Sequence, residues 1–306
     1  MSSAPRFTLE RASQALYRPS TLQQSSNLRG LIKSGKIVIG TSLSYPSCHV
    51  AKTVAVTGAD LCWLDVEHVA WSPKLLVQCI QTIIHESGGT MIPMVRVPTK
   101  TSFDWIAWCL DAGAGGIIVP HMETVEEMQD VINACRFPPA GQRSFPPFTF
   151  IPGVTDTTPE GESVFSLANQ HIAIIPQIES QLGIQNLDEI VALAEVDAFM
   201  IGHGDLRLEM GLPLRGLPLA GTGTEAEYVK AVEKAKKVSQ ERGKPIVGGA
   251  VGPEMIKMRI DQGYRIIVCC LDLHTFAFGM IKTVSEGRAT AEEYMQSLHD
   301  SKKAEN

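Results

Sequence analysis

Two apolar segments of the sequence end in acidic side chains. IIPQIES (residues 174–180) contains Gln177 and Glu179, and VDAFMIGHGD (196–205) ends at Asp205. In a strand, alternate side chains share a face, so Gln177 and Glu179 would point the same way. Two carboxylates on neighbouring strand ends repel each other unless one is protonated or a cation lies between them. Oxygen ligands from two residues suit Mg²⁺ or Mn²⁺, and the alternative is that each acid caps a helix or pairs with an arginine.

Other polar residues follow apolar segments in the same way. Arg96 lies at the end of MIPMVRV. It is a candidate to supply a fixed positive charge where an oxyanion develops, and the alternative is a structural ion pair with one of the acids. Asp65 and His68 are three residues apart, so Asp65 is a candidate to orient the imidazole for proton transfer. His121 follows GGIIVP and either lines a pocket or satisfies a backbone carbonyl.

From residue 36, eight short apolar segments alternate with amphipathic helical stretches. Near-continuous apolar strands that alternate with helices predict a parallel sheet covered by helices. Eight such units in about 250 residues match a (β/α)₈ TIM barrel. The alternative, a doubly wound open sheet, usually has a GxGxxG turn after its first strand, and IGTSLSYPS lacks one. The predicted strands are 37–44, 61–66, 91–97, 115–120, 172–179, 196–202, 244–250 and 265–273.

Local signals place several helix ends and one long loop. Ser72-Pro73 is a predicted N-cap followed by proline, Thr124 and Glu127 match a capping box, and Gly243 closes a long amphipathic helix. Residues 137–163, between the fourth and fifth strands, are rich in Pro, Gly and Phe. A loop of this length inside a compact domain is usually functional or disordered, and its aromatic content favours function.

Composition excludes several classes of function. The net charge of −6, with no basic run, argues against a nucleic-acid partner, and the apolar runs are too short to span a membrane. Seven cysteines without CxxC spacing indicate reduced thiols and a cytoplasmic location. Residues 1–34 are predicted to form an N-terminal arm, the alternative being an organellar transit segment. A catalytic barrel (35–286) and a C-terminal helix and tail (287–306) are predicted to follow.

Several motifs occur together in one order and spacing: WLDVEH, MVRVP, DAGAGGIIVPHMETVEEM, PQIES and VDAFMIGHGDL. With them the sequence resembles the metal-dependent 2-oxo-acid aldolases of the HpcH/HpaI type, from about residue 35 to 285. The resemblance implies a (β/α)₈ barrel whose last helix packs on a neighbouring subunit, in a homohexamer built as a trimer of dimers. It also implies a cofactor, Mg²⁺ or else Mn²⁺ or Co²⁺.

By position, the resemblance implies a role for each motif residue. Glu179 and Asp205 would bind the metal, and Arg96 would stabilise the enolate oxygen of a 2-oxo acid, pyruvate or oxaloacetate. His68, oriented by Asp65, would move the proton. Further residues would bind substrate or support the site: Gln177, the backbone amides of Gly204 and Asp205, Trp63, His121, Phe145 and Pro147 at the substrates, and Glu67 and His203 behind them.

The implied activity is a carbon–carbon lyase acting through a pyruvate enolate, with aldol cleavage or condensation, or oxaloacetate decarboxylation, as its reactions. The second substrate is an aldehyde, or a 2-pyrone if decarboxylation is coupled to bond formation. His203 departs from the family pattern, because proline usually follows the glycine at this position. Two other classes remain: a non-catalytic oligomeric scaffold or ligand sensor, and a phosphate-dependent isomerase, for which no glycine-rich phosphate site follows the last strands.

Overall fold

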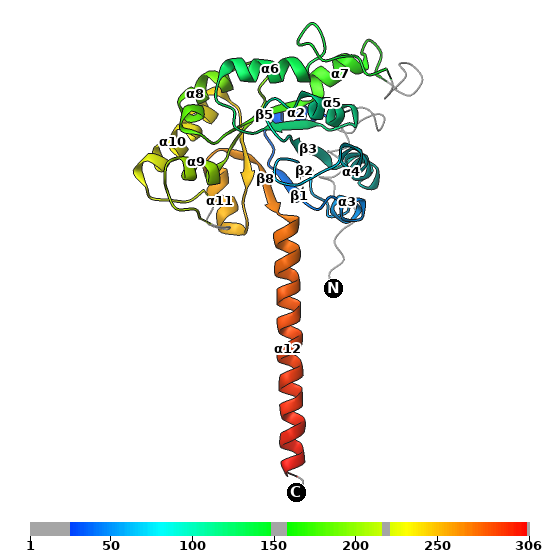
Figure 1. The fold of residues 1–306 in the computed structure, drawn as a ribbon, viewed down its shortest axis with the longest axis vertical. Helices are drawn as coiled ribbons and strands as arrows, with labels where there is room; N and C mark the ends of the chain where they lie inside the picture. Colours follow the sequence, from blue (N-terminus) through cyan, green and yellow to red (C-terminus); the bar gives the residue numbers. More distant parts are fainter. Residues whose placement is uncertain (1–24, 148–157, 216–220, 305–306) are drawn as a thin grey trace.

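The computed structural model of the chain, which describes residues 25–147, 158–215 and 221–304, is a closed parallel barrel (Figure 1). Each strand pairs with the next in sequence, and the last pairs with the first. The predicted (β/α)₈ barrel is therefore confirmed. Its strands are β1 (Val38–Leu43), β2 (Leu61–Asp65), β3 (Ile92–Arg96), β4 (Gly116–Val119), β5 (Ala173–Ile178), β6 (Phe199–Ile201), β7 (Ile246–Gly249) and β8 (Tyr264–Cys270).

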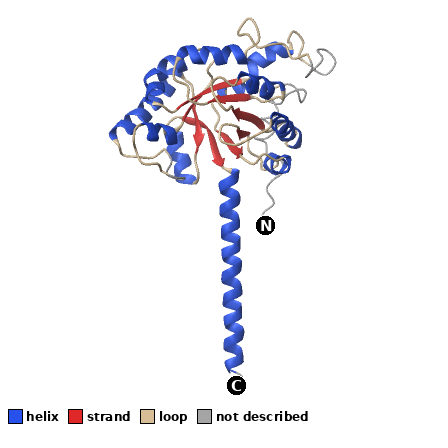
Figure 2. Cartoon of the chain, in the orientation of Figure 1, coloured by secondary structure: helices blue, strands red, loops and turns tan. Residues whose placement is uncertain are grey.

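Helices surround the strands, and one long helix extends away from the barrel (Figure 2). The predicted caps are confirmed: Ser72 Oγ accepts from the Leu75 amide, Thr124 and Glu127 form a capping box, and Gly243 closes its helix at φ 62°. The helices are α2 (Leu28–Lys33), α3 (Cys48–Ala55), α4 (Pro73–Glu86), α5 (Phe103–Asp111), α6 (Val125–Cys135), α7 (Val164–His171), α8 (Gln181–Ala192), α9 (His203–Glu209), α10 (Ala226–Arg242), α11 (Pro253–Asp261) and α12 (Asp272–Ala304).

Strand alternation divides the apolar side chains into two cores. One set, which includes Leu61, Met94 and Val268, fills the inside of the barrel. The intervening set, which includes Leu64 and Val95, packs between the strands and the helices. Because both faces of each strand are buried, the strands read as almost continuous apolar runs. Arg96, Gln177 and Glu179 are buried polar residues at the carboxyl-terminal ends of β3 and β5.

Helix α2 closes the opposite, amino-terminal end of the barrel. Leu28 is fully buried in the interior core, and a Cβ at Gly116 would lie only 2.6 Å from its Cδ2 atom. Arg29 of the same helix pairs with Asp197 at 2.6 Å. The predicted arm, residues 1–34, thus includes a packed helix at 28–33; residues 1–24 lie outside the described part of the chain.

The described residues of the long segment after α6 lie at this same end, because the segment follows the end of a helix and precedes the next strand. Arg143 pairs with Asp111, the last residue of α5, at 2.7 Å, and its guanidinium lies over the ring of Phe137. Phe137 in turn contacts Phe165 of α7 edge to face, with ring centroids 4.9 Å apart. Residues 148–157 of the predicted 137–163 loop lie outside the described ranges.

Helix α12 leaves the carboxyl-terminal end of β8 and is anchored there by Asp272. The carboxylate of Asp272 accepts hydrogen bonds from Ser42 Oγ (2.7 Å) and from the amides of Ser44 (2.6 Å) and Tyr45 (3.2 Å). The helix then runs unbroken across the predicted boundary at 286/287 and projects from the barrel (Figure 1).

The cysteines and the helices each have one further general property. All seven cysteines are free thiols, and Cys62, Cys79, Cys109 and Cys135 are buried. Among the helices described, none combines the length and apolar character that crossing a membrane requires.

The burial of Leu28 yields a test of the role of α2. We expect Leu28→Ala to lower the free energy of unfolding by about 3 kcal/mol, because it leaves a cavity in a packed core. Urea unfolding followed by circular dichroism measures the change. Leu214→Ala, at a leucine that is 60% exposed, is the matched control and should change stability by less than about 0.5 kcal/mol. Equal effects of the two variants would show that α2 does not seal the barrel.

Candidate active site

Asp65 and Arg96 form an ion pair across the ends of two adjacent strands. They are direct register partners on β2 and β3. The Arg96 side chain places Nε 2.9 Å from Asp65 Oδ1 and Nη2 2.8 Å from Oδ2, so the contact is bidentate. Arg96 is also stacked on Trp63, with its Cζ atom 4.8 Å from the ring centroid. This buried guanidinium is thereby fixed in position and orientation.

Glu67 rather than Asp65 is the acid near His68. Arg96 Nη1 lies 2.9 Å from Glu67 Oε2, and the exposed His68 places Nε2 3.6 Å from the same oxygen. The predicted Asp65–His68 pair is thus not brought together: Asp65 pairs with Arg96, and His68 lies beside Glu67. Burial raises the pKa of Glu67, although Arg96 and His68 oppose the shift.

Gln177 connects the guanidinium to the second strand-end acid. Its Oε1 accepts a long hydrogen bond (3.5 Å) from Arg96 Nη1, and its Nε2 donates to Glu179 Oε2. An amide has a donor end and an acceptor end, so it can link a cation to a carboxylate in this order. Because Gln177 and Glu179 share a strand face, the Gln177 amide can bond both the Arg96 guanidinium and the Glu179 carboxylate.

Glu179 is buried at the end of β5, beside the turn that follows β6. The backbone amide of His121 donates to Glu179 Oε1 at 2.8 Å, and the imidazole Nδ1 lies 3.6 Å from the same atom. A Cβ at Gly202 would lie 2.1 Å from Glu179 Oε2, so only glycine permits this approach. Burial raises the pKa of Glu179, and the nearby charge of Asp205 adds to the shift, whereas Gln177 and His121 lower it.

Lys100, a residue that the sequence did not single out, holds the turn that contains His121. Its ammonium lies 3.2 Å from the His121 carbonyl oxygen, 3.3 Å from Glu123 Oε2 and 2.5 Å from Glu127 Oε1. His121 adopts a left-handed backbone conformation (φ 50°), which costs roughly 1–2 kcal/mol for a residue with a side chain. The clamp stabilises that conformation, and with it the hydrogen bond from the His121 amide to Glu179. The lysine in VPTK had no periodic or motif signal to mark it.

His203, Gly204 and Asp205 form the first turn of α9. Asp205 is partly buried, and its charge acts on Glu179 across the turn. The imidazole of His203 points the other way: Nδ1 lies 2.7 Å from Tyr228 Oη, and Nε2 lies 2.8 Å from Tyr264 Oη. Burial, together with Arg259 and Arg207, holds the pKa of His203 well below its usual value, so this imidazole is neutral.

The site offers ligands suited to a divalent cation. Besides Glu179 and Asp205, one atom each of Glu67, His121 and Glu179 lie within 4.8 Å of one another. Carboxylate oxygens are the ligands that Mg²⁺ and Mn²⁺ prefer, and burial without a cation raises the pKa of both glutamates. A divalent cation would offset the repulsion between these acids, so the residues present fit such an ion.

Trp63, Phe145 and Pro147, which with His121 are predicted to lie at the second substrate, fall in two places. Trp63 lies at the site, inside the barrel beneath Arg96, and its Nε1 atom is buried with no partner among the described residues. Phe145 instead contacts Phe165 of α7, with centroids 5.7 Å apart, and Pro147 is exposed. Because their segment joins a helix to the next strand, it lies at the amino-terminal end of the barrel. This chain therefore does not bring Phe145 or Pro147 to its own strand-end site.

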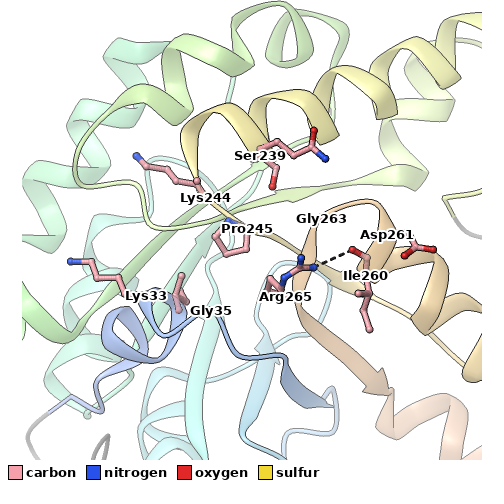
Figure 3. Close-up of a pocket in the computed structure, with 12 residues that line it drawn as sticks. Lys33, Gly35, Ser239, Lys244, Pro245, Ile260, Asp261, Gly263 and Arg265 are labelled. Atoms are coloured by element: carbon pink, nitrogen blue, oxygen red, sulfur yellow. Dashed lines mark hydrogen bonds between the residues drawn. The ribbon is translucent and has the colours of Figure 1, made fainter.

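A hollow lies at the amino-terminal end of the barrel, with a volume of about 360 Å³ (Figure 3). It is bordered by Lys33, Lys244 and Arg265. Lys244 Nζ, however, binds the carbonyl oxygens at the end of α8 (2.6 and 2.7 Å), and Arg265 binds the Ile260 carbonyl at 3.1 Å. These cations already have backbone partners, so the strand-end cluster remains the candidate active site.

A barrel with an acid, guanidinium and amide cluster at its strand ends defines a class of protein, and the comparisons agree with it. The family model for the HpcH/HpaI aldolase/citrate lyase family matches residues 43–240. The chain belongs to this family. The resemblance in its motifs is thereby confirmed, as is the prediction of an enzyme of the aldolase and carbon–carbon lyase class.

Two curated relatives and two solved structures illustrate the similarity. A hydroxypyruvate/pyruvate aldolase from Roseobacter denitrificans is 26% identical over 243 residues, which is 79% of this chain and 89% of the relative. A 2-keto-3-deoxy-L-rhamnonate aldolase from Escherichia coli (strain K12) is 25% identical over 254 residues, 81% of this chain and 88% of the relative. Macrophomate synthase is 34% identical with a TM-score of 0.85, covering 94% of this chain and 99% of that one. The citrate synthase SbnG is 25% identical with a TM-score of 0.73, covering 87% and 99%.

The Lys100 clamp can be tested with Mn²⁺ as a probe. We expect Lys100→Met to weaken Mn²⁺ binding about tenfold, because the turn that orients His121 against Glu179 loses its cation. Titration followed by electron paramagnetic resonance measures the free ion. Lys100→Arg keeps the charge and should retain most of the affinity. Unchanged binding by Lys100→Met would mean that the His121 turn holds its position without the clamp.

Proposed function

We propose that this protein is a divalent-metal-dependent lyase that forms the enolate of pyruvate, or of the pyruvate unit released from oxaloacetate. The observation that supports this most directly is the chain Arg96–Gln177–Glu179, in which a buried cation and a buried carboxylate are joined by one amide. Such a pair has one group that stabilises an oxyanion and one that binds a cation. The family and its aldolase members agree with the proposal.

Glu179 and Asp205 are the proposed metal ligands, and Mg²⁺ is the proposed ion, with Mn²⁺ or Co²⁺ as substitutes. The charge of Asp205 adds to the rise in the pKa of the buried Glu179, as expected for two acids that share a cation. His121 and Glu67 lie close enough to complete an alternative set. A bound divalent cation would polarise the keto group of a 2-oxo acid and favour loss of a proton or of carbon dioxide.

The protein's own groups supply the rest of the chemistry. Arg96 holds its guanidinium in a fixed position at the strand ends, where it would stabilise the negative charge that develops on the substrate's keto oxygen. Asp65 orients this guanidinium. The backbone amides of Gly204 and Asp205, in the first turn of α9, donate to the substrate carboxylate.

His68 is the proposed proton carrier, and Glu67 is the acid that assists it. The imidazole is exposed at the mouth of the site and lies 3.6 Å from Glu67 Oε2, so it can exchange protons with both solvent and substrate. Trp63 covers the inner wall of the pocket, where it excludes water from the reacting carbon.

The second substrate of the proposed reaction is an aldehyde, which makes the reaction an aldol cleavage or condensation. A second candidate is decarboxylation of oxaloacetate coupled to bond formation on a 2-pyrone. The similarity to macrophomate synthase over 94% of this chain favours it, together with Trp63 and His121 at the pocket. A non-catalytic scaffold or sensor would have no use for the buried ion pairs at the strand ends.

Proton exchange at the methyl group of pyruvate tests the proposal. In D₂O with Mg²⁺ or Mn²⁺, we expect the methyl signal in the NMR spectrum to decay only when protein and metal are both present. Glu179→Gln and Asp205→Asn should each slow exchange by about 100-fold or more, because each removes a charge that holds the cation. Glu254→Gln, at an exposed glutamate on α11, is the matched control and should exchange like the wild type.

Three outcomes would contradict parts of this assignment. No exchange with either metal would remove the enolate mechanism and leave the scaffold. Normal exchange by Asp205→Asn, with loss in His121→Ala, would move the metal to the set formed by Glu67, His121 and Glu179. Oxaloacetate loss no faster than with free metal would remove decarboxylation as a reaction of this enzyme.

We further propose that α12 packs on a second copy of the chain, within a hexamer built as a trimer of dimers and located in the cytoplasm. Exposed apolar side chains recur along α12 at spacings of three and four residues from 273 to 284 and again at 294 and 298, a stripe that a single copy leaves in water. The stripe includes Leu273, Phe276, Met280, Val284, Tyr294 and Leu298. Contributions of Phe145 and Pro147 to an acceptor pocket would then have to come from another copy.

Light scattering after size-exclusion chromatography tests this assembly. The 33.2 kDa chain should elute as an oligomer, and Val284→Asp should shift it towards the monomer because a charge enters the apolar stripe. Ala289→Asp, which places the same charge on the opposite side of α12, is the matched control. A monomeric wild type, or an oligomer that Val284→Asp leaves intact, would contradict the proposed role of the helix.

A further inference from the structure

His203 lies in a hydrogen-bonded tether directly behind the turn that contains Asp205. Its two ring nitrogens contact two tyrosine hydroxyls from different elements, Tyr228 of α10 at 2.7 Å and Tyr264 of β8 at 2.8 Å. A neutral imidazole has one donor and one acceptor nitrogen, and each hydroxyl can serve either role, so both contacts are satisfied at once. The side chain is therefore held from both sides.

The tyrosines are themselves immobilised. Tyr228 and Tyr264 are almost completely buried, and each ring has a buried guanidinium over it: Arg207 lies 4.8 Å from the Tyr228 centroid and Arg259 lies 4.7 Å from the Tyr264 centroid. Arg259 also donates to Tyr264 Oη at 3.3 Å. The anchor points of His203 therefore have well-defined positions.

Only a short stretch of backbone separates His203 from the acids of the site. His203 is the first residue of α9, Gly202 before it lies against the Glu179 carboxylate, and Asp205 follows two residues later. Rotation of the turn about Gly202 and Gly204 would carry Asp205 away from Glu179, because glycine imposes little restriction on the backbone. Holding the imidazole of His203 prevents that rotation.

We propose that the Tyr228–His203–Tyr264 tether positions Asp205 against Glu179, so that the two tyrosines are positioning residues for the metal site. The inference rests on the proposed function, because it takes Asp205 as a metal ligand. Tyr228 and Tyr264 touch neither the substrate nor the cation. They act on the site only through His203.

Mn²⁺ binding, followed by electron paramagnetic resonance, tests the tether. We expect Tyr228→Phe and Tyr264→Phe each to raise the dissociation constant about tenfold, because each leaves a ring nitrogen of His203 without a partner. In the pyruvate exchange assay, the same variants should need more metal and substrate for half-maximal rate, with the rate at saturation nearly unchanged. Thr53→Val, which removes an exposed hydroxyl that donates to the His49 carbonyl within α3, is the control and should bind like the wild type.

A second set of variants separates positioning from packing. Proline fixes φ near the helical value and is well tolerated at the first position of a helix, so His203→Pro holds the turn without the tether. We expect Tyr228→Phe to weaken Mn²⁺ binding in the wild-type background but not in the His203→Pro background. The same loss of affinity in both backgrounds would show that Tyr228 acts by packing alone, and would overturn the proposal.

The failure of the tether is distinguishable from the failure of the proposed function. If both tyrosine variants bind Mn²⁺ like the wild type while Asp205→Asn does not, the tether is wrong and the metal site stands. If Asp205→Asn also binds normally, Asp205 is not a ligand, and the tether proposal falls with that assignment. Thermal unfolding of each variant accompanies the titrations, so that binding is compared only among folded proteins.

Discussion

The positive charge of Arg96 must be stabilised inside a barrel that is otherwise lined with apolar side chains. An ion buried without a partner costs several kcal/mol, so the surrounding polar groups are arranged to compensate it. Asp65 meets the guanidinium with both oxygens, Glu67 approaches a third nitrogen, and Trp63 covers one face. These contacts leave the guanidinium at one fixed place at the carboxyl-terminal end of the barrel.

The need to balance buried charge also applies to the acids at the ends of β5 and β6. Gln177 takes a hydrogen bond from Arg96 and gives one to Glu179, so the position of the carboxylate depends on that of the cation. Glu67, Glu179 and Asp205 together bring more negative charge than Arg96 neutralises. Burial raises the pKa of Glu67 and of Glu179, and a divalent cation would supply a counter-charge to these acids.

Three peripheral devices hold this arrangement from outside. Lys100 fixes the left-handed turn at His121 from one side, and the tyrosine tether of His203 holds the turn of Asp205 from the other. At the far end, α2 closes the barrel beneath the apolar interior. Helix α12 projects from the barrel with a stripe of exposed apolar side chains, the surface proposed to pack on a second copy (Figure 1).

The alternation of apolar side chains within strands and the order of strands and helices are local properties of the chain. The sequence alone was therefore enough to determine the features that depend on them. It predicted the eight strands, the barrel, and the gathering of Asp65, Arg96, Gln177 and Glu179 at one end, because parallel strands align their carboxyl ends. The partners of these groups depend on distances between segments far apart in the chain, so only the tertiary structure decided them. It paired Asp65 with Arg96 rather than His68, brought Lys100 to His121, placed His203 between two tyrosines, and put Phe145 at the opposite end of the barrel. A side chain's choice among several nearby charges is fixed by packing, and no pattern along one chain records that choice.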